Sequence, residues 1–161
     1  MNGADGDLVG GTGDLTGTYG SEAILPIKAA YWVGQPDNPS EAAGGPFVNV
    51  FSSAVTCNDI SVSGWLSTIP QDTQVLELII GTTTVGLSAR AASSAGANVA
   101  EVNYLFGRPS GEERANGGSV KLTAYEREAS VDAMVDVTFS SGSSTGTFHA
   151  VYCPGGQEES R

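Results

Sequence analysis

The amino-acid sequence predicts an all-β fold, an antiparallel β-sandwich of about nine to ten strands, with a closed β-barrel as the alternative. Three observations lead to this prediction. Apolar and polar residues alternate along several short segments, most clearly in 131–139, and this period of two is typical of half-buried strands. Short runs of Gly, Ser, Asn and Pro separate these segments and can turn the chain. The 161 residues include 22 glycines and only 16% charged residues, which is typical of secreted β-proteins with many turns.

The length of the chain favours a single domain, which we place at 21–153. Residues 1–20 are rich in Gly and Asp and are expected to form a flexible tether that leads into a first edge strand near 15–19. The tail at 154–161 is expected to be disordered.

The first strand inside the domain is expected at 24–33, where Pro26 indicates a strand start or a sheet edge. A long loop with three prolines and three glycines follows at 34–46. The next strand is expected at 47–51, and 52–59 is expected to connect it to the following one.

A further strand is expected at 60–68, with Gly64 as a candidate bulge. The apolar segment 73–81 fits either a helix or a buried strand, and its short length favours a strand. A strand at 85–91 is expected to pair with it across the turn at 81–82. The segment 98–106 also fits a helical face, and we predict a strand there.

The C-terminal part of the chain predicts a meander of three antiparallel strands. Val120, Leu122 and Ala124 share one face of the first strand, and residues 131–139 and 146–153 form the next two. One face of such a meander must be buried against a second layer.

This C-terminal stretch resembles the end of a loose group of largely uncharacterised bacterial envelope lipoproteins. The resemblance rests on the strands GSVKLT (118–123), VDVTF (135–139) and GTFHAVYC (146–153), the last of which matches a GTF-A-YC pattern. It covers roughly the last 40 residues of the chain well and the rest only in outline. It implies a compact all-β envelope domain with a disulfide, and it implies no catalytic residues.

The formal net charge of −11 argues against nucleic acid as a partner, because phosphate binding requires clustered Lys and Arg. It also argues against direct docking on anionic lipid headgroups. No apolar run is long enough to span a bilayer, so no direct membrane insertion is expected. A Gly/Asp-rich start is what would follow the lipidated cysteine of a lipoprotein. An N-terminal lipid anchor in the native precursor is therefore one expectation.

The two cysteines, Cys57 and Cys153, lie 96 positions apart, and neither belongs to a C-x-x-C pair. A Cys/His zinc site cannot be assembled with one histidine in the chain. In a chain that looks extracytoplasmic, an even number of cysteines favours one disulfide. The expected location is the periplasm, the outer-membrane surface or the exterior. The alternative is two buried free thiols in a cytosolic protein.

The motifs that carry catalysis are absent from the sequence, and we do not expect an enzyme. His149 is the only histidine, and it falls in the middle of an expected strand, where a half-buried sheet residue is more common than a catalytic base. Asp132 and Asp136 share one strand face about 13 Å apart, too far for the carboxylate pair of a retaining glycosidase. No cofactor is expected. Asp5, Asp7 and Asp14 are weak calcium candidates, since the full calcium-loop pattern is missing.

The candidate binding surface combines residues in or beside the long loop with two aromatic residues that share one face of the strand expected at 98–106. Aromatic rings on a sandwich can stack sugars or partner side chains, although most rings belong to the core. The candidate residues are Trp32, Asp37, Asn38, Tyr104 and Phe106.

These observations together predict a non-catalytic, extracytoplasmic β-sandwich of the bacterial envelope that binds a protein or glycan partner. A self-assembling or adhesive subunit of an extracellular structure is the first alternative, since exposed edge strands can pair between copies. A hydrolase of unrecognised type is the second.

Overall fold

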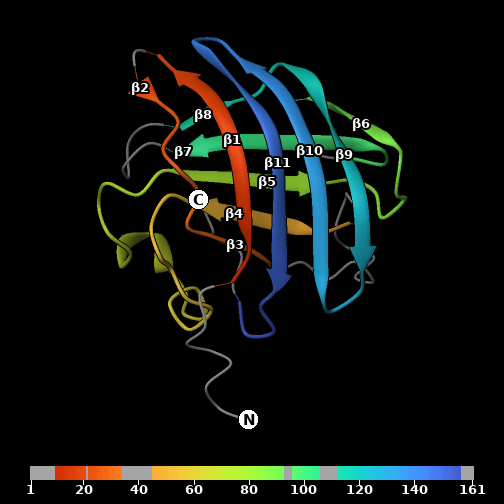
Figure 1. Ribbon diagram of the computed structural model, residues 1–161. Helices are drawn as coiled ribbons and strands as arrows, with labels where there is room; N and C mark the ends of the chain where they lie inside the picture. Colours follow the sequence, from red (N-terminus) through yellow and green to blue (C-terminus); the bar gives the residue numbers. More distant parts are fainter. Residues whose placement is uncertain (1–9, 21, 34–44, 93–95, 106–111, 157–161) are drawn as a thin grey trace.

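The computed structural model describes residues 10–20, 22–33, 45–92, 96–105 and 112–156, and these form eleven strands and one turn of 3-10 helix. The all-β prediction is confirmed. The strands lie in two layers that cross one another, and the arrangement is consistent with the predicted sandwich (Figure 1).

One layer, which we call the open layer, contains the N-terminal strand and the C-terminal meander. Its strands follow the order β2-β1-β11-β10-β9, and every neighbouring pair is antiparallel. The first and last strands of the chain are thus neighbours in the sheet. The strands are β1 (Thr12–Tyr19), β2 (Glu22–Ala23), β9 (Gly117–Glu126), β10 (Ser130–Phe139) and β11 (Gly142–Tyr152).

The other layer, which we call the clad layer, is built from the middle of the chain. Its order is β3-β4-β5-β7-β8, again with antiparallel neighbours. The strands predicted at 47–51, 73–81 and 98–106 all lie here, so the strand is confirmed over the helix at both ambiguous segments. The strands are β3 (Ala29–Trp32), β4 (Phe47–Phe51), β5 (Val75–Ile80), β7 (Val99–Leu105) and β8 (Glu112–Arg114).

Two short parallel pairings lie at the corners where the layers meet. We predicted a purely antiparallel arrangement, so the sheet differs from that prediction in being mixed. At one corner the end of β11 pairs with β3 over two residues. At the other corner β6 (Ser88–Ala91) pairs in parallel with β7 and antiparallel with β9. Backbone hydrogen bonding therefore continues from one layer to the other at both corners, which protects strand edges.

The main hydrophobic core lies between the two layers. Val131, Val135 and Val137 of β10 fill it from the open layer, as the predicted alternation requires. The rings of Tyr19 and Tyr104 stack within this core, one from each layer. Burial raises the pKa of both phenols well above the ordinary value of 10.0, so both are neutral at physiological pH.

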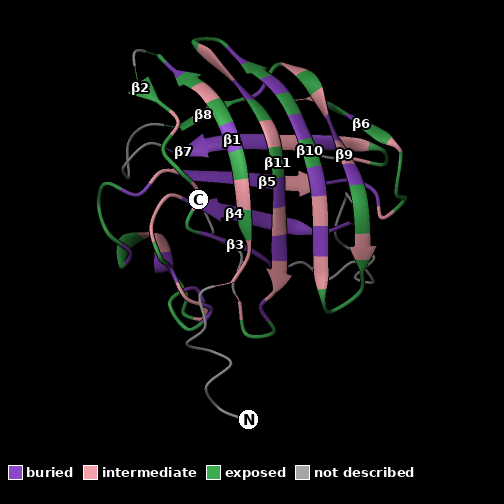
Figure 2. Ribbon diagram, viewed as in Figure 1, coloured by how far each residue is buried: buried purple, intermediate pink, exposed green. Residues whose placement is uncertain are grey.

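A second apolar cluster covers the outward face of the clad layer. The chain segment 52–74, which we call the cladding, places Val55, Ile60, Trp65 and Ile69 against this face. Trp65 is fully buried and meets Phe51 of β4 edge to face. Figure 2 shows the result: β3, β4, β5 and β7 are buried almost throughout, whereas buried and more exposed residues alternate along β1 and β10.

The strand predicted at 60–68 is wrong, because this part of the cladding consists of turns and a short 3-10 helix, Trp65–Ser67. Gly64 precedes the helix with φ of 74°, a left-handed conformation that favours glycine. The hydroxyls of Ser61, Ser67 and Thr68 donate to nearby backbone carbonyls. Such local bonds compete with a strand ladder, and this competition explains the difference.

Two other expectations need correction. The strand expected at 24–33 forms only at Ala29–Trp32. The strand expected at 85–91 forms at Ser88–Ala91 but does not pair with β5, because β4 and β7 already occupy both sides of β5. The chain after β5 therefore crosses to the far corner, where β6 meets β7 and β9.

Candidate functional site

The outward face of the open layer carries polar side chains at every second position along three neighbouring strands. Most are hydroxyl-bearing, and all are exposed or half-buried. Strand alternation places them there, because the residues between them face the core. They are Thr12, Asp14, Thr16 and Thr18 of β1, Ser143, Thr145, Thr147 and His149 of β11, and Asp132, Asp136 and Thr138 of β10, where the apolar Met134 occupies the remaining outward position.

Strand register brings part of this face together around one hollow. His149 lies directly between Thr12 of β1 and Asp132 of β10, and Thr147 lies opposite Asp14. An open hollow of about 450 Å³ lies over these strands. Its polar side chains are those of Thr12, Asp14, Thr123, Asp132, Thr147 and His149, and backbone at Gly13, Ala133 and Phe148 completes its lining.

A shift in strand pairing contributes to the shape of the hollow. The register between β10 and β9 shifts between Asp132 and Ala133, so Thr123 has no directly opposed residue on β10. Such bulges bend a strand and change the direction of the neighbouring side chains. Thr123 is exposed and lines the hollow from β9.

His149 and Asp132 form a cross-strand pair within the hollow. The Nδ1 atom of His149 lies 2.5 Å from Oδ1 of Asp132, and both side chains are partly exposed, at 45% and 37%. The Asp132 carboxylate fixes the orientation of the imidazole ring. Because Nδ1 faces Asp132, Nε2 is the ring nitrogen left to contact a ligand.

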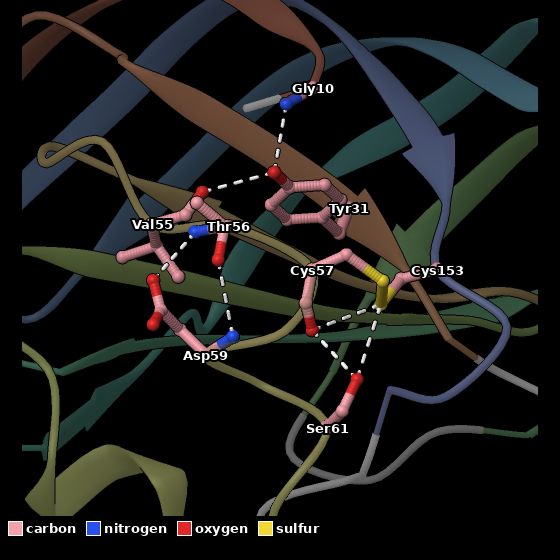
Figure 3. Close-up of a disulfide and its surroundings, with 8 residues drawn as sticks. All are labelled: Gly10, Tyr31, Val55, Thr56, Cys57, Asp59, Ser61 and Cys153. Atoms are coloured by element: carbon pink, nitrogen blue, oxygen red, sulfur yellow. Dashed lines mark hydrogen bonds between the residues drawn. A yellow bond between two sulfur atoms is a disulfide. The ribbon is translucent and has the colours of Figure 1, made fainter. Parts of the chain in front are cut away.

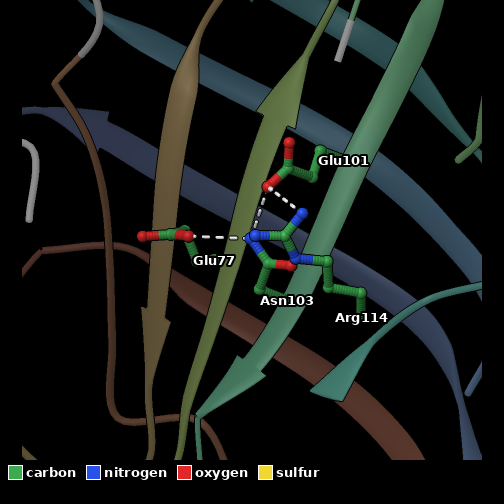
Figure 4. Close-up of polar contacts among 4 residues, drawn as sticks. All are labelled: Glu77, Glu101, Asn103 and Arg114. Carbon is green, nitrogen blue, oxygen red and sulfur yellow. Dashed lines mark hydrogen bonds and ion pairs between the residues drawn. The ribbon is translucent and has the colours of Figure 1, made fainter. Parts of the chain in front are cut away.

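A second group of polar residues lies on the outward face of the clad layer, in a single cross-strand row. Asn49, Glu77, Asn103 and Arg114 are aligned by register on β4, β5, β7 and β8. The first three are fully buried. Figure 4 shows the Asn103 side chain between the carboxylates of Glu77 and Glu101.

Asn103 uses its amide nitrogen to hold these two acids. Its Nδ2 donates to Oε1 of Glu77 and to Oε1 of Glu101, each at 3.0 Å. Arg114 approaches Glu101 at 4.0 Å from the edge of the layer (Figure 4). Bonded polar groups in a buried layer specify which residues lie opposite one another, because any other register would leave them without partners. Within the described residues, both side-chain amide atoms of Asn49 lack a hydrogen-bond partner.

The disulfide joins the cladding to the corner where the layers meet (Figure 3). Cys57 and Cys153 are bonded as predicted, with 5.6 Å between their Cα atoms. Nearby, the Tyr31 hydroxyl accepts from the backbone N–H of Gly10 and donates to the carbonyl of Val55. Burial raises the pKa of Tyr31 above its ordinary value. The disulfide and Tyr31 thus attach the cladding to β11 and β3.

Two of the three aromatic candidates of the predicted binding surface are not on the surface. Trp32 and Tyr104 are buried in the core between the layers, with 0% and 1% exposure. The prediction is wrong for these two residues because β3 and β7 belong to the clad layer, whose inward face packs on the open layer. Trp32 lies against the rings of Tyr125 and Tyr152. The remaining candidates, Asp37, Asn38 and Phe106, lie outside the described residues.

The calcium candidates are only partly placed by the structure. Asp14 lies exposed on β1, whereas Asp5 and Asp7 fall outside the described residues. In the part of the chain that the structure describes, no group of three or more His, Cys, Asp or Glu side chains could hold a metal ion.

Sequence reasoning recognised Asp132 and His149 as strand residues but did not bring them together, and it missed Thr12, Thr123 and Thr147. The alternation of residues 131–139 already placed Asp132 on the solvent side. The missing information was the pairing of β1 with β11, because the predicted meander made β10 and β11 neighbours but nothing local indicates that β1 lies on the other side of β11.

Comparisons with protein families, with curated proteins and with solved structures find no match for this chain. Within the described residues, no helix has the length and apolar character needed to cross a membrane.

Proposed function

We propose that the protein is a non-catalytic binding module of the bacterial envelope and that it binds a glycan in the hollow of the open layer. The observation that carries this proposal is the contrast between the two outward faces. The cladding covers one face, whereas the other carries a hollow lined by hydroxyls, carboxylates and an imidazole.

The chemistry of the hollow matches sugar hydroxyls. Carboxylates accept hydrogen bonds, and threonine hydroxyls both donate and accept them. The volume of about 450 Å³ is in the range of small-ligand sites. Protein interfaces are centred on apolar and aromatic anchors, whereas Met134 is the large hydrophobic residue exposed on this face. A glycan is therefore favoured over a protein partner.

The extracytoplasmic part of the proposal is supported by the disulfide, because such bonds persist mainly in oxidising compartments. The resemblance of residues 118–153 to envelope lipoproteins agrees with this location. An N-terminal lipid anchor in the precursor would keep the module at the membrane surface without a spanning segment.

The test is a binding screen of neutral and charged oligosaccharides by isothermal titration calorimetry. We expect at least one to bind, and the double variant Thr12→Val/Thr147→Val should weaken binding about tenfold, because it removes two hydroxyls from the hollow. The matched control is Thr16→Val/Thr145→Val, which alters the same two strands beyond the hollow lining. Equal losses in both variants, or no binding of any oligosaccharide, would contradict the proposal. Turnover of a bound oligosaccharide would support the hydrolase alternative.

Self-assembly is a second candidate, favoured by the edge of β1. From Thr12 to Thr16 this strand pairs with β11 on one side, and among the described strands only β2 pairs on the other side, at Thr18 and Tyr19. The Gly17 carbonyl accepts from the backbone N–H of Ile24. Such an edge can accept a strand from another copy. Size-exclusion chromatography with light scattering tests this candidate: mass that rises with concentration supports it, and a constant monomer mass contradicts it.

A further inference from the structure

We infer that the ligand of the hollow is a cationic glycan, an oligosaccharide of amino sugars. This inference rests on the proposed function and narrows it to one class of sugar. The observation behind it is the distribution of charge among the side chains that line the hollow.

The hollow contains acidic groups and no permanently basic ones. Asp14 lines it from β1 and Asp132 from β10, and its described lining includes neither Lys nor Arg. Lys121 of β9 shares a cross-strand row with Met134, Thr147 and Asp14, but it lies three strands away from Asp14 and is not part of the lining. A ligand ammonium group would therefore meet two carboxylates and no repelling permanent cation.

The two carboxylates have different surroundings. Asp132 is bonded to His149, which lies between it and Thr12 of β1. Asp14 is exposed, one row further along β1, and forms no ion pair with a described residue. Asp14 is therefore the carboxylate most available to a ligand ammonium, and Asp132 contributes mainly by orienting the imidazole.

The remaining groups favour a sugar over other cations. Thr12, Thr123 and Thr147 surround the carboxylates and match a ligand with several hydroxyls. A lysine side chain offers one charged group and an apolar stem, and so leaves these hydroxyls without ligand partners. Acidic glycans are disfavoured by the hollow and by the net charge of −11.

The experiment compares a glucosamine tetramer with its fully N-acetylated form by isothermal titration calorimetry on the whole chain. We expect the glucosamine tetramer to bind about tenfold more tightly, because only it carries ammonium groups. Raising the salt from about 0.05 M to about 0.5 M should weaken its binding and leave that of the acetylated form unchanged.

Three variants locate the effect. Asp14→Asn should weaken binding of the glucosamine tetramer about tenfold and leave the acetylated tetramer within about twofold. Asp132→Asn should weaken both, because it also frees the imidazole. Asp136→Asn is the matched control, since Asp136 lies on the same face of β10 but outside the lining, and we expect a change within about twofold.

The outcomes separate this inference from the proposed function. Tighter binding of the acetylated tetramer, or equal losses of affinity in Asp14→Asn and Asp136→Asn, would overturn the inference. The proposed function would then stand, with a neutral glycan as the ligand. Equal binding of tetralysine would also overturn it, because charge alone would then account for affinity. Failure of every sugar to bind would overturn both.

Discussion

The open and clad layers pack on the same core, yet their outward faces differ: the outward face of the open layer contacts solvent, and that of the clad layer is buried. Along β10 buried and exposed residues alternate, whereas all five residues of β4 are buried. The difference comes from the cladding, which covers the outward face of β3, β4, β5 and β7. A polar residue on the outward face is hydrated in the open layer, whereas in the clad layer it needs a partner inside the protein.

An acidic residue on the outward face therefore affects stability differently in the two layers. Asp132 and Asp136 of the open layer are half-buried and exposed, respectively, so water can hydrate their carboxylates. Glu77 of the clad layer is fully buried and is held by Asn103. We expect substitutions in the clad layer to change stability, and those in the open layer to change binding.

The largest expected effect comes from removing the centre of the cladding. Trp65→Ala should lower the free energy of unfolding by about 3–5 kcal/mol, since it leaves a large cavity against Phe51. The counterpart in the open layer is Met134→Ala. Met134 is 48% exposed, so this substitution should change the free energy of unfolding by less than about 0.5 kcal/mol. Urea denaturation of both variants measures the difference. Similar losses would mean that the two outward faces do not differ as described.

Removing the disulfide should have the next largest effect. The variant Cys57→Ala/Cys153→Ala opens a loop that spans 96 positions and should lose about 2–4 kcal/mol. The bond itself is checked by peptide mapping without reductant. Ser61→Ala is the control, because it removes a hydrogen bond to the Cys57 carbonyl but keeps the disulfide, and it should cost about 1 kcal/mol. Two free thiols in protein prepared under oxidising conditions would contradict both the bond and the case for an extracytoplasmic location.

A smaller loss is expected from the buried polar row. Asn103→Leu keeps the approximate side-chain volume but removes the two donated bonds to Glu77 and Glu101, and it should cost roughly 2–3 kcal/mol. The comparison is Asp136→Asn in the open layer, which should change stability by less than about 0.5 kcal/mol. Thermal and urea unfolding measure both. A neutral Asn103→Leu variant would show that the row is not needed for stability.

The smallest effect is expected for the pair of His149 and Asp132. Both side chains are partly exposed, so a double-mutant cycle with His149→Ala and Asp132→Ala should give a coupling free energy below about 1 kcal/mol. The same variants should still weaken ligand binding. Strong coupling in stability would indicate a structural role for the pair and would weaken the case for a binding role.

Much of the fold follows from local patterns along the chain. The strand at Phe47–Phe51 has the predicted bounds, and the alternation of 131–139 gives the correct buried face of β10. The even cysteine count, with neither Cys57 nor Cys153 in a metal or redox motif, favoured the pairing that the structure contains. These features are local, or depend on counting one residue type, and so the sequence alone determines them.

The candidate site depends on contacts that no local pattern contains. The hollow requires β11 to lie between β1 and β10, and the burial of Trp32 requires β3 to belong to the clad layer. Alternation reports that one face of a strand is buried, but it does not report what covers the other face. Asp132 and Glu77 are both acidic strand residues in the sequence. Only the placement of the cladding over one layer makes Glu77 a buried group and leaves Asp132 partly exposed in the hollow.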